Sequence, residues 1–192
     1  MARKGKRKVM PLSRGEVRRL VEACERPRDR ALIAGLFLTG ARISEFLRLR
    51  KSDLSVEELH GRKYLVVRLE TLKNREVPYR NVPIPMSEPL LRPFLLYLRE
   101  VGRGERLFPI TRQRAWQILK EAASKAGLDP KRVWCHVMRH SRLTELGSYL
   151  GLVELTQFAG WSLPKDFGEA RVYVHMAWRS YAPKMPRGER RV

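Results

Sequence analysis

The segment between Arg28 and Leu38 constrains the fold more than any other part of this 192-residue chain. Its apolar residues surround a helix instead of forming one stripe along it, and they are Ala31, Leu32, Ile33, Leu36, Phe37 and Leu38. A helix that is apolar all round is stable in water only when other elements enclose it. The sequence therefore predicts one domain packed around this central helix, for which the chain is long enough.

Amphipathic segments with the helical period supply the enclosing elements. The clearest covers 13–25, because Ser13 and Glu16 have the spacing of a capping box and an apolar stripe follows them. Helical patterns with stop signals such as Gly127, Gly151 and Gly160 continue along the chain. They predict further helices at 41–49, 88–100, 111–126, 136–150, 152–159 and 167–176.

Two stretches, Tyr64–Leu69 and Val77–Ile84, have the composition of β-strands and predict a small antiparallel sheet or hairpin. Pro78, Pro83 and Pro85 indicate that the second strand lies at an edge or is irregular. The predicted fold class is therefore mainly α (α+β), a helical domain with a small antiparallel sheet inserted near the N-terminal third.

The charge of the chain points to a polyanionic partner. Lys and Arg number 40 against 20 for Asp and Glu, which gives a net charge of +20. Nucleic acid is the first expectation and an acidic membrane surface the second. Part of the excess lies in a basic N-terminal arm, residues 1–11, and in a basic C-terminal tail, residues 177–192. The remainder belongs to the body of the domain.

Several protein classes are disfavoured by composition. No apolar run approaches the roughly 20 residues that cross a bilayer, and no signal sequence is apparent, so a soluble protein that stays in its cell is expected. Cys24 and Cys135 cannot form a disulfide framework and lack metal-ligand spacing, so no metal site is expected. The scarcity of Asn and Gln is compatible with a thermophilic source.

Three polar stretches, Thr39–Glu45, His136–His140 and Val172–His175, combine arginine, histidine and tyrosine. His136, Arg139 and His140 share one face of a helix, with apolar neighbours that indicate partial burial. They form either a basic surface stripe or a cluster that needs an anionic partner. Arg42 is likewise either a surface cation paired with Glu45 or a group that grips two phosphate oxygens through its planar fork.

These stretches read T-G-x-R-x-x-E, H-x-x-R-H and Y-x-H, and in this order they resemble the tyrosine recombinase, or phage integrase, family. The resemblance extends from about Leu12 to Met176, nearly the whole chain. It implies that residues 12–176 form a catalytic domain of the DNA breaking-rejoining type. Three ordered motifs are far more specific than any one of them.

The resemblance implies a role for each motif residue. Arg42 and Arg139 clamp the scissile phosphate and neutralise charge that develops in the transition state. Tyr173 is the nucleophile, whose attack leaves a covalent 3′-phosphotyrosine and a free 5′-hydroxyl without metal, ATP or another cofactor. His136 helps to move the tyrosine proton, and His140 supports the phosphate.

Four further residues carry weaker implications. Lys73 matches the family's hairpin lysine, which protonates the leaving oxygen, with Lys63 as the fallback; taken alone, Lys73 is a solvated turn residue. Trp161 stands where a histidine is commoner, so it either orients the phosphate or is simply a buried aromatic residue. Glu45 and His175 are supporting residues.

Tyr149 and Tyr181 also follow Arg139 in the sequence, and the resemblance disfavours them as the nucleophile. Tyr173 comes 34 residues after Arg139 and two before His175, which suits the family's spacing. Tyr181 belongs to a proline-flanked basic tail.

The expected partner is double-stranded DNA, bound through phosphate contacts that weaken steeply with salt. The resemblance also implies a tetramer on DNA, with 177–192 as the segment exchanged between subunits. It implies a DNA-associated cytoplasmic protein, which a virus or plasmid could encode. Only residues 1–11 precede the predicted catalytic domain, so either the chain is part of a longer protein or the basic arm replaces an N-terminal clamp.

Two other functions remain open, and a third is disfavoured. A catalytically degenerate DNA-binding module would keep the basic face, and a type IB topoisomerase would use the same chemistry. An RNA-binding protein is disfavoured because no recognisable RNA-binding module is present.

Overall fold

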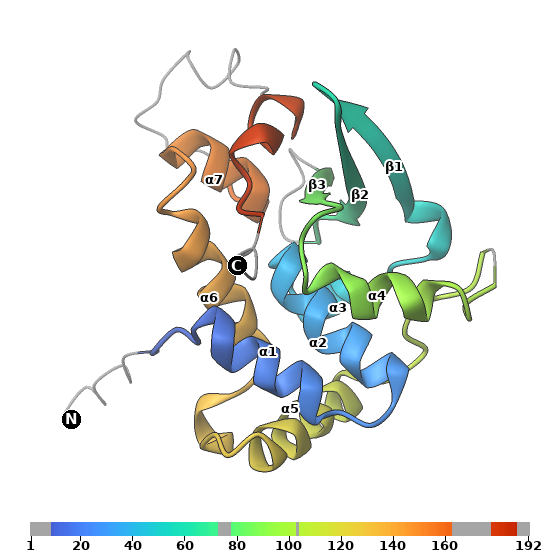
Figure 1. Cartoon of the computed structure of the whole chain (residues 1–192), viewed down its shortest axis with the longest axis vertical. Coiled ribbons are helices and arrows are strands. Elements are labelled where there is room, and N and C mark those ends of the chain that lie inside the picture. The colour runs from blue at the N-terminus through green and yellow to red at the C-terminus, as the bar shows by residue number, and fades with distance from the viewer. Residues whose placement is uncertain (1–8, 73–77, 103, 163–177, 188–192) are drawn as a thin grey trace.

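The computed structural model describes residues 9–72, 78–102, 104–162 and 178–187. Figure 1 shows α2 near the centre, with the sheet beyond one of its ends and α5 at the opposite side of the molecule. The helix expected at 167–176 lies outside the described residues. The elements are α1 (Arg14–Ala23), α2 (Pro27–Thr39), α3 (Ile43–Phe46), β1 (Leu54–Leu59), β2 (Arg62–Glu70), β3 (Tyr79–Pro85), α4 (Leu91–Leu98), α5 (Arg112–Lys125), α6 (Cys135–Leu146) and α7 (Leu152–Ala159).

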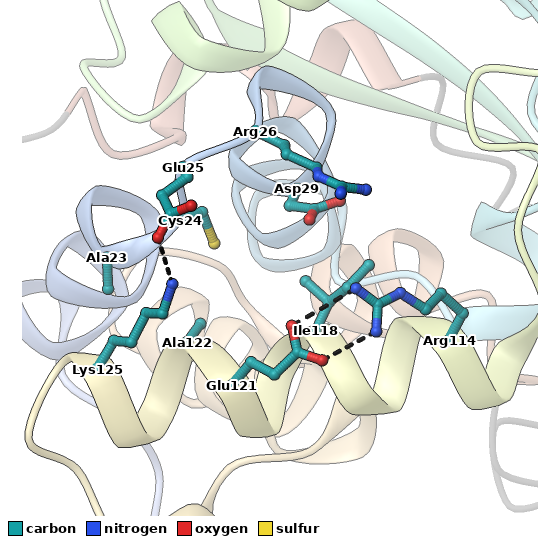
Figure 2. A pocket seen from close by; sticks show the side chains of 10 residues that line it. All are labelled: Ala23, Cys24, Glu25, Arg26, Asp29, Arg114, Ile118, Glu121, Ala122 and Lys125. Carbon is teal, nitrogen blue, oxygen red and sulfur yellow. Dashed lines mark hydrogen bonds and ion pairs between the residues drawn. The ribbon is translucent and has the colours of Figure 1, made fainter.

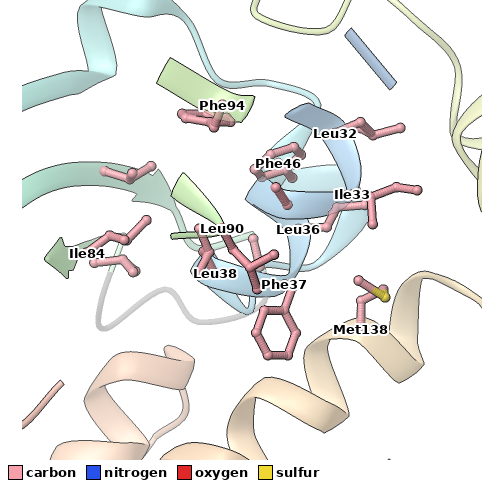
Figure 3. Packing of buried hydrophobic residues seen from close by; sticks show 14 of the residues in the cluster. Leu32, Ile33, Leu36, Phe37, Leu38, Phe46, Ile84, Leu90, Phe94 and Met138 are labelled. Carbon is pink, nitrogen blue, oxygen red and sulfur yellow. The ribbon is translucent and has the colours of Figure 1, made fainter. Parts of the chain in front are cut away.

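The predicted central helix is α2, and every residue from Ala31 to Thr39 is buried. Helices α1, α4, α5 and α6 and strand β3 all contact it. Figure 3 shows its side chains facing Phe46, Phe94 and Met138 from neighbouring elements. A Cβ at Gly35 would lie only 2.5 Å from Phe46 Cζ and 2.9 Å from Phe94 Cε2, so the glycine lets these rings approach the helix. Each large apolar side chain enclosed in this way contributes roughly 1.5–3 kcal/mol.

The inserted sheet is antiparallel with the strand order β1-β2-β3. Strand β3 is an edge strand, as its prolines predicted, and Pro83 pairs with Val66 of β2. Residues 64–67 of β2 are all buried, so the strand is covered on both faces. Part of the cover is Trp178, whose ring meets Tyr64 edge-on at 6.3 Å. The described part of the C-terminal tail therefore packs against the sheet of its own chain.

Three predicted helices are clearly shorter than expected. The helix predicted over 88–100 spans only Leu91–Leu98. The helix predicted over 41–49 spans only Ile43–Phe46. Beyond it Leu49 accepts a hydrogen bond from Leu107 N at 2.9 Å and Arg50 forms a β-bridge with Arg106, which pulls the chain out of the helix. The helix predicted over 136–150 ends at Leu146, because tighter turn bonds follow, such as Tyr149 N to Leu146 O.

Helix α6 is fixed to the N-terminal part of the chain by a cluster of buried and partly buried charges. Arg14 of α1 donates to Glu88 Oε1 at 2.6 Å and to Glu145 Oε1 at 2.8 Å. Arg142, whose side chain is fully buried, donates to the other oxygen of Glu145. The Arg142 Nε and Nη2 atoms are buried without a hydrogen-bond partner among the described residues. The charge of Arg142 is therefore compensated chiefly by Glu145.

Replacing Glu145 by alanine is expected to lower the free energy of unfolding by about 3 kcal/mol, because it leaves Arg142 as an uncompensated buried charge. Urea unfolding followed by circular dichroism measures this value. Glu121→Ala is the matched control, since Glu121 forms an ion pair with Arg114 on exposed α5 surface. Its expected cost is below about 1 kcal/mol. Equal costs for the two substitutions would contradict the assignment.

Candidate functional site

Arg42 lies at the turn between α2 and α3. Gly40 ends α2 with a left-handed backbone (φ +55°), and a Cβ there would come within 3.1 Å of Phe158 Cε1, so glycine suits the position on two counts. Arg42 then caps α3, and Glu45 accepts hydrogen bonds from Arg42 N at 3.2 Å and Arg42 Nη1 at 2.8 Å. Glu45 is buried, whereas about a quarter of the Arg42 side chain is exposed.

The ion pair with Glu45 is the structural alternative that the sequence left open for Arg42. It leaves most of the guanidinium unused, because arginine has five N–H donors and this pair engages one. Arg42 is therefore held at the edge of the core with donors still available for a ligand.

Arg139 joins its own motif segment and the end of α7 to the first motif segment. It lies in the second turn of α6 and is buried, donating from Nη1 to Gly40 O at 2.6 Å and from Nη2 to Ala159 O at 2.7 Å. Gly40 precedes Arg42 by two residues, and Ala159 precedes Trp161 by two. Burial and the charges of Arg42 and Arg80 lower the pKa of Arg139 to about 10, so its charge is retained at neutral pH.

Trp161 follows the end of α7 and is 42% exposed. The alternative that it is simply a buried aromatic residue is therefore wrong. Arg139 Cζ lies 5.8 Å from the centre of its ring, so the indole borders the arginine without filling the core.

His136 and His140 lie one helical turn apart on α6, His136 exposed and His140 partly buried. Partial burial lowers the pKa of His136 from 6.5, and the neighbouring charges of Arg139, His140 and Arg42 lower it further. His136 is therefore neutral at pH 7 and able to accept a proton.

Arg80 belongs to this group, although it was not predicted from the sequence. It lies in β3 with only 6% of its surface exposed and donates to Glu45 Oε2 at 2.8 Å. It also bonds to Thr71 Oγ1 at 3.2 Å and Phe158 O at 3.0 Å. The available signal was the period of two along the strand, which puts Arg80 on the same face as Val82 and Ile84.

Together these hydrogen bonds form a connected network, which we call the arginine circuit. Its members come from the α2–α3 turn, β3, α6 and the end of α7, and they are Gly40, Arg42, Glu45, Arg80, Arg139, Phe158 and Ala159. Among the described residues it combines three guanidinium groups with one carboxylate. Such an excess of positive charge at a partly exposed site suits a bound anion.

Three of the predicted site residues, Lys73, Tyr173 and His175, lie outside the described residues. Thr71, two residues before Lys73, contacts Arg80 of the circuit. Lys63 lies near the opposite end of β2, eight residues from Thr71, or roughly 26 Å along an extended strand. The fallback lysine is therefore remote from the arginines.

The two alternative tyrosines are poorly placed for catalysis. Tyr181 is 2% exposed and donates its hydroxyl to Asn81 O at 2.9 Å, and burial raises its pKa. Tyr149 is exposed beyond the C-terminal end of α6, roughly 20 Å along the helix direction from His136.

A separate pocket of about 180 Å³ lies between the α1–α2 turn and α5 (Figure 2). Four of the charges on its walls pair with one another, Arg114 with Glu121 and Lys125 with Glu25. It opens beside the start of α2, whereas Arg42 follows the end of this helix. The pocket is therefore separate from the arginine circuit.

Among the described residues, no group of three or more His, Cys, Asp or Glu residues could hold a metal ion. In the same part of the chain, no helix is long and apolar enough to span a membrane.

Comparisons with known proteins identify relatives of the chain. The chain is 36% identical over 128 residues to the tyrosine recombinase XerD of Corynebacterium glutamicum, covering 62% of this chain and 39% of the relative. It is 32% identical over 161 residues to XerD of Yersinia pestis, covering 78% and 50%. The chain thus spans half or less of the length of these two relatives.

A solved structure of the XerH site-specific recombinase bound to difH substrate has a similar fold. It superposes with a TM-score of 0.59 at 23% identity, covering 86% of this chain and 50% of the XerH chain. Residues 11–177, which include all three motifs, match the Phage integrase family. On this match and the shared fold, the chain belongs to the phage integrase family of tyrosine recombinases.

Proposed function

We propose that this protein cleaves and rejoins double-stranded DNA as a site-specific recombinase or integrase, through a covalent 3′-phosphotyrosine. The observation that carries the proposal is the arginine circuit, in which Arg42 and Arg139 are held together with an excess of positive charge. A scissile phosphodiester is the anion that fits such a clamp, because arginine binds two nonbridging oxygens at once.

In this mechanism Tyr173 attacks the phosphorus and the 5′-oxygen leaves. The bond between the phosphorus and the tyrosine oxygen forms as the bond to the 5′-oxygen breaks, so the energy of the phosphodiester is retained for rejoining. His136 accepts the tyrosine proton, and Lys73 protonates the leaving oxygen. Arg42, Arg139, His140 and Trp161 bind the phosphate, and Glu45 orients Arg42; His175 has a supporting role.

The test uses a library of duplexes, each with a nick close to a candidate scissile phosphate, so that the short cleaved strand diffuses away. Covalent protein–DNA complexes are collected under denaturing conditions in EDTA, and the attached DNA is sequenced. A recombinase yields adducts on a defined sequence. DNA binding without any adduct would favour the degenerate binding module, and relaxation of supercoiled plasmids lacking that sequence would favour the topoisomerase.

The pH dependence of cleavage tests the role of His136. The rate is expected to fall as the pH drops through the pKa of His136, which lies below 6.5, because protonation removes the base. Single-turnover cleavage measured across about pH 5 to 9 shows this limb. His136→Asn should be slower at neutral pH and lack the limb. An unchanged acid limb in that variant would contradict the assignment.

We propose further that the protein assembles as a tetramer on DNA by exchanging its C-terminal segment, 177–192. In the described part of this segment, Tyr181 packs against Phe158 at 6.5 Å and Lys184 pairs with Glu154 at 2.5 Å, both within one chain. The same surface of a neighbouring subunit offers identical contacts, which supports exchange. Light scattering of the protein on a synapsed pair of sites measures the number of subunits.

A further inference from the structure

Arg80 engages three acceptors with three different nitrogens of one guanidinium. Nη2 donates to Glu45, Nη1 to Thr71 and Nε to Phe158 O. The acceptors belong to α3, the end of β2 and the end of α7. Because the guanidinium is planar and rigid, its three bonds fix the relative positions of these segments. Each of the three guanidinium nitrogens of Arg80 donates to a protein acceptor, so Arg80 acts on a DNA phosphate through other residues.

The first of these links leads to Arg42. Both carboxylate oxygens of Glu45 are occupied, Oε1 by Arg42 Nη1 and Oε2 by Arg80 Nη2 and Arg42 N. Arg80 therefore holds the plane of the carboxylate, and that plane sets where the Arg42 guanidinium points.

The second link leads to Arg139. Arg80 and Arg139 bind neighbouring carbonyls at the C-terminus of α7, Phe158 O at 3.0 Å and Ala159 O at 2.7 Å. The last carbonyls of a helix lack partners within it and carry partial negative charge, so they are good acceptors for cations. Gly160 lies against Arg80, and a Cβ there would come within 2.9 Å of Arg80 Nη1.

We infer that Arg80 is a positioning residue that sets the spacing of Arg42 and Arg139, acting through Glu45 and the end of α7. The inference rests on the proposed function, since it concerns the clamp for the scissile phosphate. The alternative is that Arg80 serves only the stability of the fold. The two differ in whether the effect of Arg80 on cleavage depends on Arg42.

The experiment is a double-mutant cycle on full-length protein, with single-turnover cleavage of a nicked duplex at saturating concentration. Arg80→Lys keeps the charge but loses the three-way fork, and it is expected to slow cleavage about 100-fold, the usual cost of a small misplacement. The dissociation constant for DNA should stay within about threefold, because Arg80 is not a phosphate ligand. In an Arg42→Ala background the further loss should be less than about fivefold, because the two residues act in one unit.

Arg68→Gln is the matched control, an exposed arginine on β2 whose register partner on β3 is Asn81, the neighbour of Arg80. It is expected to cleave at the wild-type rate. Thr71→Val is a milder second variant that removes one acceptor of Arg80. It is expected to slow cleavage several-fold when Arg42 is present and to have no such effect in the Arg42→Ala background. It keeps the test decisive if Arg80→Lys fails to fold.

Wild-type cleavage by folded Arg80→Lys, or equal losses with and without Arg42, would overturn the inference. If Arg80→Lys does not fold, wild-type cleavage by Thr71→Val overturns it as well. Failure of the wild-type protein to form any adduct would instead count against the proposed function. These results therefore distinguish failure of the inference about Arg80 from failure of the proposed function.

Discussion

Tyr173→Phe is expected to abolish the covalent complex with DNA, lowering the rate of cleavage by about 10⁴-fold or more, because the nucleophilic oxygen is lost. DNA affinity should be nearly unchanged, since one hydroxyl contributes little beside many phosphate contacts. Gel analysis of the protein after incubation with a nicked duplex measures the adduct, and fluorescence anisotropy measures binding.

Tyr181→Phe is the control for this substitution. The Tyr181 hydroxyl is engaged by Asn81 O and buried, so the variant is expected to form the adduct at the wild-type rate. A Tyr173→Phe protein that still becomes attached to DNA, or a Tyr181→Phe protein that does not, would move the nucleophile to the other tyrosine.

The second large effect is expected from Arg42→Ala, which should slow cleavage by about 10² to 10³-fold, because a preorganised donor to the phosphate is removed. The protein should remain folded. Glu45 keeps its bond to Arg80, so the variant loses one charge-assisted side-chain bond, worth about 2 kcal/mol. Single-turnover cleavage and thermal unfolding measure the two quantities.

Arg48→Ala controls for the general loss of positive charge. Arg48 is exposed and pairs with Glu70 at 3.0 Å on the surface. Its removal should change the cleavage rate by less than about threefold. If both alanine variants slow cleavage alike, the effect of Arg42 is electrostatic attraction for DNA and not phosphate clamping.

Local sequence patterns predicted most of the helical part of the fold. The capping box of Ser13 and Glu16 is present at α1, and the apolar circumference of α2 correctly indicated a central helix. Strand β1 was missed because Leu54–Leu59 contains two glutamates and is only partly buried. Its pairing with β2 stabilises it, and such tertiary contacts are weakly encoded in a short segment.

The functional site was predicted less completely than the helices. The motifs predicted that Arg42 and Arg139 belong to one site. In the structure their segments are in contact, because Arg139 donates a hydrogen bond to Gly40 O. Arg80 was missed because it lies among prolines in an edge strand, where an arginine is usually solvated. Its burial depends on Glu45 and Phe158, which are 35 and 78 residues away. No local pattern reports partners at such separations.

Three acceptors in the arginine circuit are main-chain carbonyls, those of Gly40, Phe158 and Ala159. A carbonyl is present whichever side chain a residue carries. A substitution at the end of α7 therefore leaves the acceptors in place and affects the arginines only through the path of the helix. Phe158 and Ala159 are themselves fully buried, so the packing of their side chains determines that path and links the core of the domain to the position of the arginines.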